Sequence, residues 1–169
     1  AAAIGIGIDV LEPMGNMIVD IGGGTSEIAV IALGGIVNNK SIRTAGDDFT
    51  DEIVEYMRKQ HNMHVGERTA EMIKIEVGSA LTQLDNPPDE YAVHGRDLLT
   101  GIPKEIMVNY SEIAYCLDKS ISKIETAVLN ALEQTPPELA ADIYRTGIYL
   151  TGGGALLRGL DKRLHAKTK

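Results

Sequence analysis

One short stretch constrains this chain more than any other: an apolar run that ends in Asp20 and passes directly into the turn residues Gly22, Gly23, Gly24 and Thr25. A strand that turns through consecutive glycines exposes several backbone N–H groups that no side chain shields, which suits phosphate oxygens. One glycine, or Asn-Gly, would satisfy a tight hairpin, so three glycines after an acid favour phosphate binding over a hairpin alone. Thr25 adds a hydroxyl, and Asp20 can hold Mg²⁺ through water, because Mg²⁺ keeps much of its hydration shell. The turn is not a P-loop, since no Gly-Lys-Ser/Thr follows it.

The residues after this turn predict two further strands. Positions 28–33 are apolar nearly throughout, which indicates a strand with both faces covered. Gly34 and Gly35 predict a second turn, and residues 36–43 a third strand that becomes more polar along its length. The start of the chain is therefore expected to form a three-stranded meander whose first turn is rich in glycine.

A second glycine turn lies near the end of the chain, at Gly152, Gly153, Gly154 and Ala155. A buried strand is expected just before it and a helix over 155–165 just after it. The N-terminus of a helix offers unpaired N–H groups and the positive end of a dipole, and glycine lets a ligand lie against the backbone. This pattern is weak alone. Two such turns about 130 positions apart on one sheet favour a ligand held between them.

Apolar spacing predicts helices and short strands between the two turns. Two helices are expected to begin at Asp47 and near Glu67, and the second ends at a break at 86–89. Short strands at 91–93 and 97–100 follow, around a turn at 94–96, and a breakpoint lies at 101–103. A long helix should then run from a Ser111 cap to about residue 134, and a short helix at 138–144 should follow a capping box at Thr135.

Two charged residues of the second expected helix, Glu71 and Lys74, stand three positions apart, so both can face one side. Taken alone, they favour a solvated ion pair. The histidines show no metal-ligand spacing, and no Ser-His-Asp or Cys-His arrangement is visible. The single cysteine, Cys116, cannot form an intrachain disulfide and is typical of a small buried residue on a helix.

Composition excludes several classes of protein. Apolar residues make up 44% of the chain and charged residues 24%, as in ordinary soluble domains. The net charge is −8, and the only basic cluster is the short tail at 162–169, which argues against a nucleic-acid surface. No apolar run reaches the length of a membrane span, and the start has no cationic segment of a signal peptide.

Together, these motifs resemble the MreB family of bacterial actin homologues, which determine rod shape. The resemblance runs through the whole chain in order, within a superfamily that includes actin, Hsp70-type chaperones, sugar kinases and the division protein FtsA. The Glu-Arg-Thr-Ala-Glu stretch at 67–71 and Gly-Gly-Gly-Ala-Leu-Leu-Arg at 152–158 are the most specific matches. The matching stretches are 20–25 with 27–30, 33–37, 45–47, 66–71 with 73–74, and 150–160.

The resemblance implies an α/β fold: an actin-like ATPase lobe of the ribonuclease-H-like type, with a mixed sheet, flanking helices and a small inserted α+β subdomain. Residues 1–47 and 102–169 would form subdomain IIA, which carries the phosphate and adenosine loops. Residues 48–101 would form the inserted subdomain IIB.

The resemblance also assigns site residues. The family's second phosphate loop corresponds to Gly22, Gly23, Gly24 and Thr25, with Asp20 near the metal. The adenosine-contacting helix corresponds to Glu71, Met72, Ile73 and Lys74, and the second adenosine loop to Gly152, Gly153, Gly154 and Ala155. Met72 stands where the family is expected to have an arginine, which affects a peripheral contact and leaves the pocket intact.

The function implied is that of a cytoskeletal ATPase that binds ATP or ADP with Mg²⁺. Such a protein polymerises into filaments that lie under the membrane and direct cell-wall synthesis and rod shape. The expected partners are further copies of itself, cytoplasmic parts of membrane morphogenesis proteins such as RodZ, and the inner face of the membrane through another lobe.

Parts of the family's site are expected outside this sequence. The first phosphate loop belongs to the other lobe, and the glutamate that orients the attacking water is expected just before Ala1, ahead of the hinge at 1–5. We therefore expect the chain alone to bind ATP weakly and to hydrolyse it negligibly. The alternatives are another ATPase of this fold (FtsA-like division protein, Hsp70-type chaperone or sugar kinase) or a nucleotide-free structural module.

Overall fold

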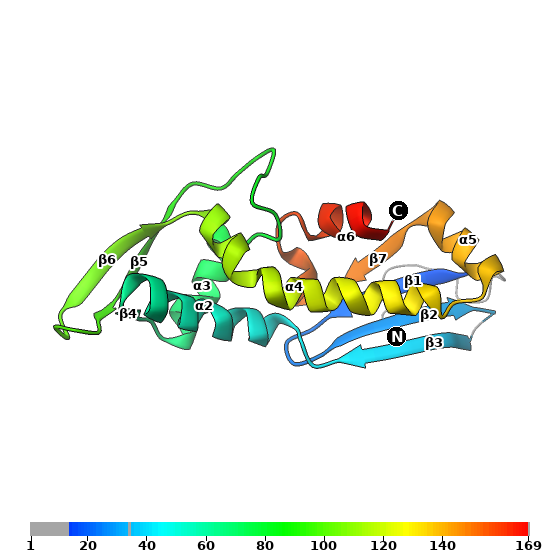
Figure 1. Ribbon diagram of the computed structural model, residues 1–169, viewed down its shortest axis with the longest axis horizontal. Coiled ribbons are helices and arrows are strands. Elements are labelled where there is room, and N and C mark those ends of the chain that lie inside the picture. Colours follow the sequence, from blue (N-terminus) through cyan, green and yellow to red (C-terminus); the bar gives the residue numbers. More distant parts are fainter. Residues whose placement is uncertain (1–13, 34, 169) are drawn as a thin grey trace. The chain divides into compact units, whose positions relative to one another are not determined.

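A computed structural model describes residues 14–33 and 35–168 of the chain (Figure 1). The chain divides into two compact units. The first comprises Ala1–Gly46, Ser122–Leu156 and Leu164–Lys169, and the second Asp47–Ile121 and Leu157–Arg163. Gly34 and the expected hinge at 1–5 lie outside the described residues. The division into subdomains IIA and IIB stays a prediction.

A mixed four-stranded sheet forms the centre of the first unit, with the strand order β3-β2-β1-β7 (Figure 1). The strands are β1 Asn16–Ile21, β2 Ser26–Ala32, β3 Gly35–Ile42 and β7 Ile148–Thr151. The first three pair antiparallel, which confirms the predicted meander, and β7 pairs parallel to β1. The first and the last strand among the described residues are therefore direct neighbours.

Burial in this sheet is more one-sided than the sequence predicted. On β2, Ile28 and Val30 are fully buried, whereas Ala29 and Ile31 on the other face are partly exposed. The expectation of two covered faces was wrong here, because a run of apolar letters does not tell how much cover each face receives. The expected burial of β7 was also wrong, since β7 ends the strand order and Tyr149 is exposed.

Helices pack on the sheet of the first unit. The long helix α4 Tyr110–Glu133 contributes its residues from Ser122 onward, and α5 Pro137–Thr146 packs against β1. The amide of Asn38 on β3 donates a hydrogen bond to the Ala131 carbonyl of α4 (3.1 Å). The core of this unit includes apolar side chains from the sheet and both helices: Met17, Ile18, Val19, Ile28, Val30, Ile124, Val128 and Ile143.

The second unit combines two helices, the first part of α4 and a small antiparallel sheet in the order β4-β5-β6 (Figure 1). The elements are α2 Gly46–His61, β4 Met63–His64, α3 Glu67–Val77, β5 Tyr91–Asp97 and β6 Pro103–Val108. The apolar positions that predicted the helices form its core: Phe49, Ile53, Met57, Ala70, Ile73, Val77, Ile113 and Leu117.

The strands of this small sheet differ from the prediction. A turn was expected at 94–96, but β5 continues through these residues. Glycine stands at position 95 because a Cβ there would lie 2.6 Å from the His64 carbonyl oxygen. Gly95 thus permits the close approach of β4. The turn lies after Asp97, whose Oδ1 accepts N–H bonds from Leu99 and Thr100 (2.8 and 3.0 Å). Strand β6 follows it and replaces the expected strand at 97–100.

Two predicted helix caps were also wrong. Asn109, not Ser111, caps α4: its Oδ1 accepts the Glu112 N–H (2.9 Å), and Glu112 Oε2 accepts the Asn109 N–H (3.3 Å). The Ser111 hydroxyl instead donates to the Thr82 carbonyl. Thr135 donates to the Ala131 carbonyl one turn back, so it does not cap α5, which starts at Pro137.

Two helix boundaries differ from the prediction, and a glycine explains each difference. α3 ends at Val77, and the Gly78 N–H closes it on the Lys74 carbonyl, well before the expected break at 86–89. The expected helix over 155–165 is divided into a 3₁₀ turn, η1 Gly153–Leu156, and the helix α6 Leu160–Thr168. Gly159 has a φ of +75°, which interrupts the helical path between them.

Candidate functional site

The β1–β2 turn is fixed at its base and open at its tip. The Gly22 N–H donates to the Thr25 carbonyl (3.0 Å), and the Gly22 carbonyl accepts the Gly46 N–H (3.0 Å). The buried Ser26 hydroxyl donates to the Thr44 carbonyl (2.6 Å). By contrast, the following glycines and Thr25 are exposed, and a Cβ on Gly24 would meet no atom within 4 Å. A held turn with open space beside its backbone suits an anionic ligand.

The second glycine turn lies directly against the end of β1. Thr151 pairs with Asp20 in the parallel ladder, so β1 and β7 end at the same edge of the sheet. Gly152 has a φ of +88°, and a Cβ on it would collide with the Ile21 carbonyl oxygen. A Cβ on Gly154 would collide with the Ile21 side chain. Only glycine permits this approach, at the edge where sheets of this kind bind ligands.

Asp20 lies at the junction of the two turns. Its Oδ1 is so near to Gly152 that a Cβ there would stand 2.5 Å away, whereas a Cβ on Gly153 would meet no atom within 4 Å. Backbone N–H groups, open space beside glycine and one carboxylate are a donor set that fits a polyphosphate with a hydrated Mg²⁺. Within residues 14–33 and 35–168, no three His, Cys, Asp or Glu side chains are grouped to hold a metal ion.

The backbone N–H of Ala155 makes a hydrogen bond within the second glycine turn. The expectation was a free N–H at the start of a helix, but Ala155 N donates to the Gly152 carbonyl (3.2 Å), and the segment is a 3₁₀ turn. In this second turn, the exposed glycines are Gly152 and Gly153, whereas Gly154 and Ala155 are half-buried.

In the second unit, Glu71 and Lys74 face the same side of α3, as their spacing predicted, and form an ion pair (Nζ to Oε2 3.0 Å). The pair has a third member that the sequence did not reveal. The Thr50 hydroxyl of α2 donates to Glu71 Oε2 (2.8 Å), and Lys74 Nζ donates to Thr50 Oγ1 (3.2 Å). The Lys74 side chain is only 16% exposed, so this is not the fully solvated pair that the stretch alone favoured.

The charge state of Glu71 follows from these contacts. Burial raises the pKa of Glu71, but the hydrogen bonds from Thr50 and Lys74, together with the Lys74 charge, outweigh it and lower the pKa below its usual value. The other two assigned residues of α3 point elsewhere: Met72 is exposed, and the Ile73 side chain is fully buried in the core.

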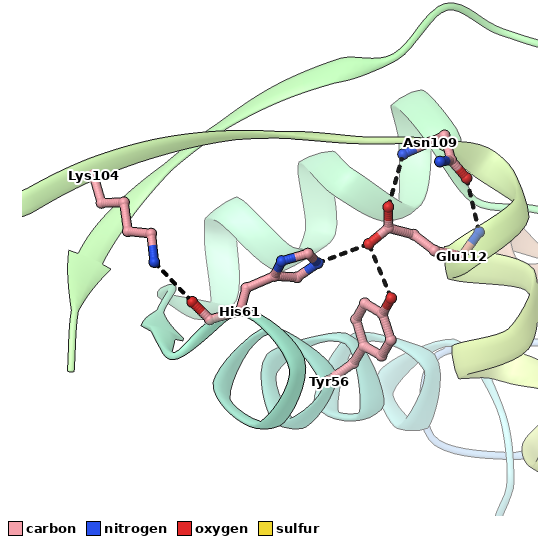
Figure 2. A network of polar contacts seen from close by, with 5 residues as sticks. All are labelled: Tyr56, His61, Lys104, Asn109 and Glu112. Atoms are coloured by element: carbon pink, nitrogen blue, oxygen red, sulfur yellow. Dashed lines mark hydrogen bonds and ion pairs between the residues drawn. The ribbon is translucent and has the colours of Figure 1, made fainter. Parts of the chain in front are cut away.

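A second polar network in this unit centres on Glu112 (Figure 2). Glu112 Oε1 accepts the Tyr56 hydroxyl (2.9 Å) and contacts His61 Nε2 (2.8 Å), while Glu112 also pairs with Asn109 in the α4 cap. Lys104 Nζ donates to the His61 carbonyl (3.0 Å). Burial, followed by the hydrogen bond and charge of Glu112, raises the pKa of Tyr56. The network ties the end of α2 to the start of α4 and to β6, which is a structural role.

Cys116 lies on the helix α4, as predicted, and its side chain is half-buried. Burial, followed by the charges of Glu52 and Glu112, raises its pKa to about 12. Its Sγ donates to the Glu52 carbonyl (3.4 Å). None of the helices in the described ranges has the length and apolar character that a membrane crossing requires.

The fold is that of an actin-like ATPase lobe. A solved MamK structure superimposes on 93% of this chain and 46% of its own, with a TM-score of 0.71 at 21% identity, which shows the fold alone. MreB5 of Spiroplasma citri, solved bound to AMPPNP, matches with a TM-score of 0.93 at 44% identity and covers 98% of this chain and 49% of its own.

Sequence comparison then identifies the family. The MreB/Mbl protein family model matches residues 1–169, and the cell shape-determining protein Mbl of Bacillus subtilis is 48% identical over 168 residues. This match covers 99% of the chain and 50% of Mbl. The chain therefore belongs to the MreB/Mbl family, as its motifs indicated, and spans about half the length of the curated relatives it matches.

Proposed function

We propose that the chain is one nucleotide-binding lobe of a cytoskeletal ATPase that binds ATP or ADP with Mg²⁺ and polymerises into filaments under the membrane. The filaments would direct cell-wall synthesis and rod shape. One observation carries the proposal: two glycine turns meet at the shared end of β1 and β7, with the Asp20 carboxylate between them. That edge supplies backbone donors without side-chain obstruction, as a polyphosphate requires.

The residues of the first unit would take the following roles. Gly23, Gly24 and Thr25 are exposed at the tip of the first turn, and their N–H groups would bind phosphate oxygens, with Gly22 fixing the base of the turn. Asp20 would hold Mg²⁺ through water, and bound Mg²⁺ would neutralise phosphate charge. The second turn would receive adenosine against its glycine backbone; its residues are Gly152, Gly153, Gly154 and Ala155.

The residues of α3 would contact the adenosine. Glu71 accepts hydrogen bonds and is ionised at neutral pH, so it suits the hydroxyls of a ribose, and Lys74 supplies a fixed cation beside it. Met72 is exposed and offers an apolar contact at the rim. Ile73 is fully buried, so its part would be to seat α3 in the core. We keep the assignment of 1–47 and 102–169 to subdomain IIA and of 48–101 to subdomain IIB as part of this proposal.

The relatives support the proposal. Mbl of Bacillus subtilis and MreB of Escherichia coli are named cell shape-determining proteins, and MreB5 of Spiroplasma citri was crystallised with AMPPNP and with ADP. We extend this to self-association into filaments, to docking of cytoplasmic parts of membrane proteins such as RodZ, and to a location in the cytoplasm at the membrane.

Hydrolysis would require a second lobe. Charge that develops on the transferred phosphoryl group must be stabilised from several directions, and the residues of this chain supply backbone donors from two turns and one carboxylate. The 169-residue chain alone should therefore bind ATP weakly and turn it over at a rate indistinguishable from the buffer control.

Two measurements on the protein in its natural length test the function. Calorimetric titration with ADP and Mg²⁺ should give saturable binding of one nucleotide per chain, and ultracentrifugation should pellet filaments with ATP but not without nucleotide. Saturable binding without any pelleting would favour a kinase or chaperone of the same fold. A lack of nucleotide binding would contradict the proposal.

A further inference from the structure

Thr50 completes a ring of three polar side chains that joins α2 to α3. Its Oγ1 lies 2.8 Å from Glu71 Oε2 and 3.2 Å from Lys74 Nζ, and these two atoms lie 3.0 Å from each other. Each member of the ring is thus within hydrogen-bond distance of the other two. Thr50 itself is buried, with 4% of its surface exposed.

The chemistry of a hydroxyl fixes the direction of these bonds. Thr50 has a single proton, which goes to the Glu71 carboxylate, and its lone pairs then face the Lys74 ammonium, which can only donate. The hydroxyl therefore fits between an ionised Glu71 and a charged Lys74, and the charge of each partner strengthens its hydrogen bond to Thr50. A threonine side chain is also stiff at χ1, so a buried threonine offers a fixed point to which two long, flexible side chains are tied.

The acidity of Glu71 agrees with this geometry. Burial raises its pKa, and among the influences that lower it the hydrogen bond from Thr50 comes first, ahead of those from Lys74. Without the hydroxyl, Glu71 would lose one of the contacts that favour its ionised form.

We propose that Thr50 is a positioning residue of the nucleotide site, whose hydroxyl holds Glu71 and Lys74 in the orientation in which they contact the adenosine. This inference rests on the proposed function. Because Thr50 is buried, it acts through the other two residues and does not touch the nucleotide. Its influence should therefore extend to adenosine recognition and leave the phosphate contacts of the glycine turns unchanged.

The test measures Mg²⁺-dependent binding of ADP and of inorganic tripolyphosphate to the protein in its natural length. Thr50→Val keeps the shape of the side chain and removes the hydroxyl, and it should weaken ADP binding about tenfold, as expected for loss of a hydrogen bond to a charged group. Tripolyphosphate binding should not change, since it lacks adenosine. Thr50→Ser, which restores the hydroxyl, should bind ADP within about twofold of the unchanged protein.

Ser120→Ala is a matched control. Ser120 is also buried, and its hydroxyl donates to a carboxylate of α2, Glu52 Oε1, at 2.6 Å, away from the Glu71 and Lys74 pair. It should lower stability much as Thr50→Val does and leave the affinities for both ligands unchanged. If Thr50→Val does not fold, Thr50→Ala makes the same comparison with a smaller side chain.

The pH dependence of ADP binding distinguishes a positioning role of Thr50 from a purely structural one, because a structural role would not shift its midpoint. In the Thr50→Val protein, the midpoint of the acid loss of ADP affinity should lie at higher pH than in the unchanged protein, because the pKa of Glu71 rises. The inference is overturned if Thr50→Val binds ADP as the unchanged protein does, or if it loses ADP and tripolyphosphate equally. Failure of the unchanged protein to bind ADP would instead overturn the proposed function on which it rests.

Discussion

The glycine turns of the first unit and the polar helix face of the second are built by opposite means. At the turns, the close approach of Gly152 and Gly154 to Ile21 depends on side-chain atoms that are absent. At the helix face, Glu71 and Lys74 are held by atoms that are present, among them the Thr50 hydroxyl. The first region should therefore lose stability when a side-chain atom is added, and the second should lose its geometry when a side-chain atom is removed.

The largest effect should come from one added methyl group, in Gly152→Ala. A Cβ there collides with the Ile21 carbonyl oxygen at a φ of +88°, so we expect a loss of about 3 kcal/mol or more in the free energy of unfolding. Urea unfolding measures it. Gly153→Ala is the control, because its Cβ meets no atom within 4 Å, and its change should stay within about 0.5 kcal/mol. Equal losses at both positions would refute the steric account of this turn.

Removal of the Glu112 carboxylate, which several residues of the second unit contact, should cause the next largest loss of stability. Glu112→Ala deprives the α4 cap, the Tyr56 hydroxyl and His61 of one shared partner, and should cost about 2 kcal/mol of stability. Glu55→Ala removes an exposed carboxylate that pairs within α2, with Arg58, and should change stability far less, because solvent screens exposed ion pairs. Thermal unfolding of the two variants side by side would show whether the network of Figure 2 holds this unit together.

A smaller, pH-dependent effect should mark the helix face. The folded-state pKa of Glu71 lies below its unfolded value near 4.5, so its stabilisation is fully present above that pH and is lost as the pH falls through the folded-state pKa. The stability difference between the unchanged protein and Glu71→Gln should shrink between pH 6 and pH 3, roughly the window in which a carboxyl titrates. A difference that stays constant over this range would show that Glu71 is not held ionised by its neighbours.

The smallest signal is expected at Cys116. With a pKa of about 12, its thiolate fraction at pH 8 is on the order of one in ten thousand, so iodoacetamide should label the folded protein far more slowly than the unfolded one. Mass spectrometry of the labelled protein measures both rates. Rapid labelling of the folded state would mean that the α2–α4 contact around Cys116 opens readily.

The sequence revealed the parts that depend on local rules. Three consecutive glycines after Asp20 predict a turn whatever surrounds them, and the spacing of Phe49, Ile53 and Met57 predicts a helix with one buried face. The meander and the helices α2, α3 and α4 followed from such patterns.

The remaining parts depend on contacts between distant residues, which local rules do not contain. Gly95 was expected in a turn because glycine is common there, but the approach of His64 explains it. Thr50 carried no signal, because its partners lie on another helix, 21 and 24 positions along the chain. Asn109 is an exception, because Asn109 and Glu112 stand three positions apart in a local capping pattern, which the prediction of a Ser111 cap overlooked.

The most direct test of the account is amide hydrogen exchange of the protein in its natural length, with and without ADP and Mg²⁺. ADP should slow exchange at the N–H groups of Gly23, Gly24, Thr25 and Gly153, and exchange at Gly101, an exposed glycine in the β5–β6 turn, should not change. Saturating ADP that leaves the amides of both glycine turns unchanged would contradict the claim that these turns hold the nucleotide.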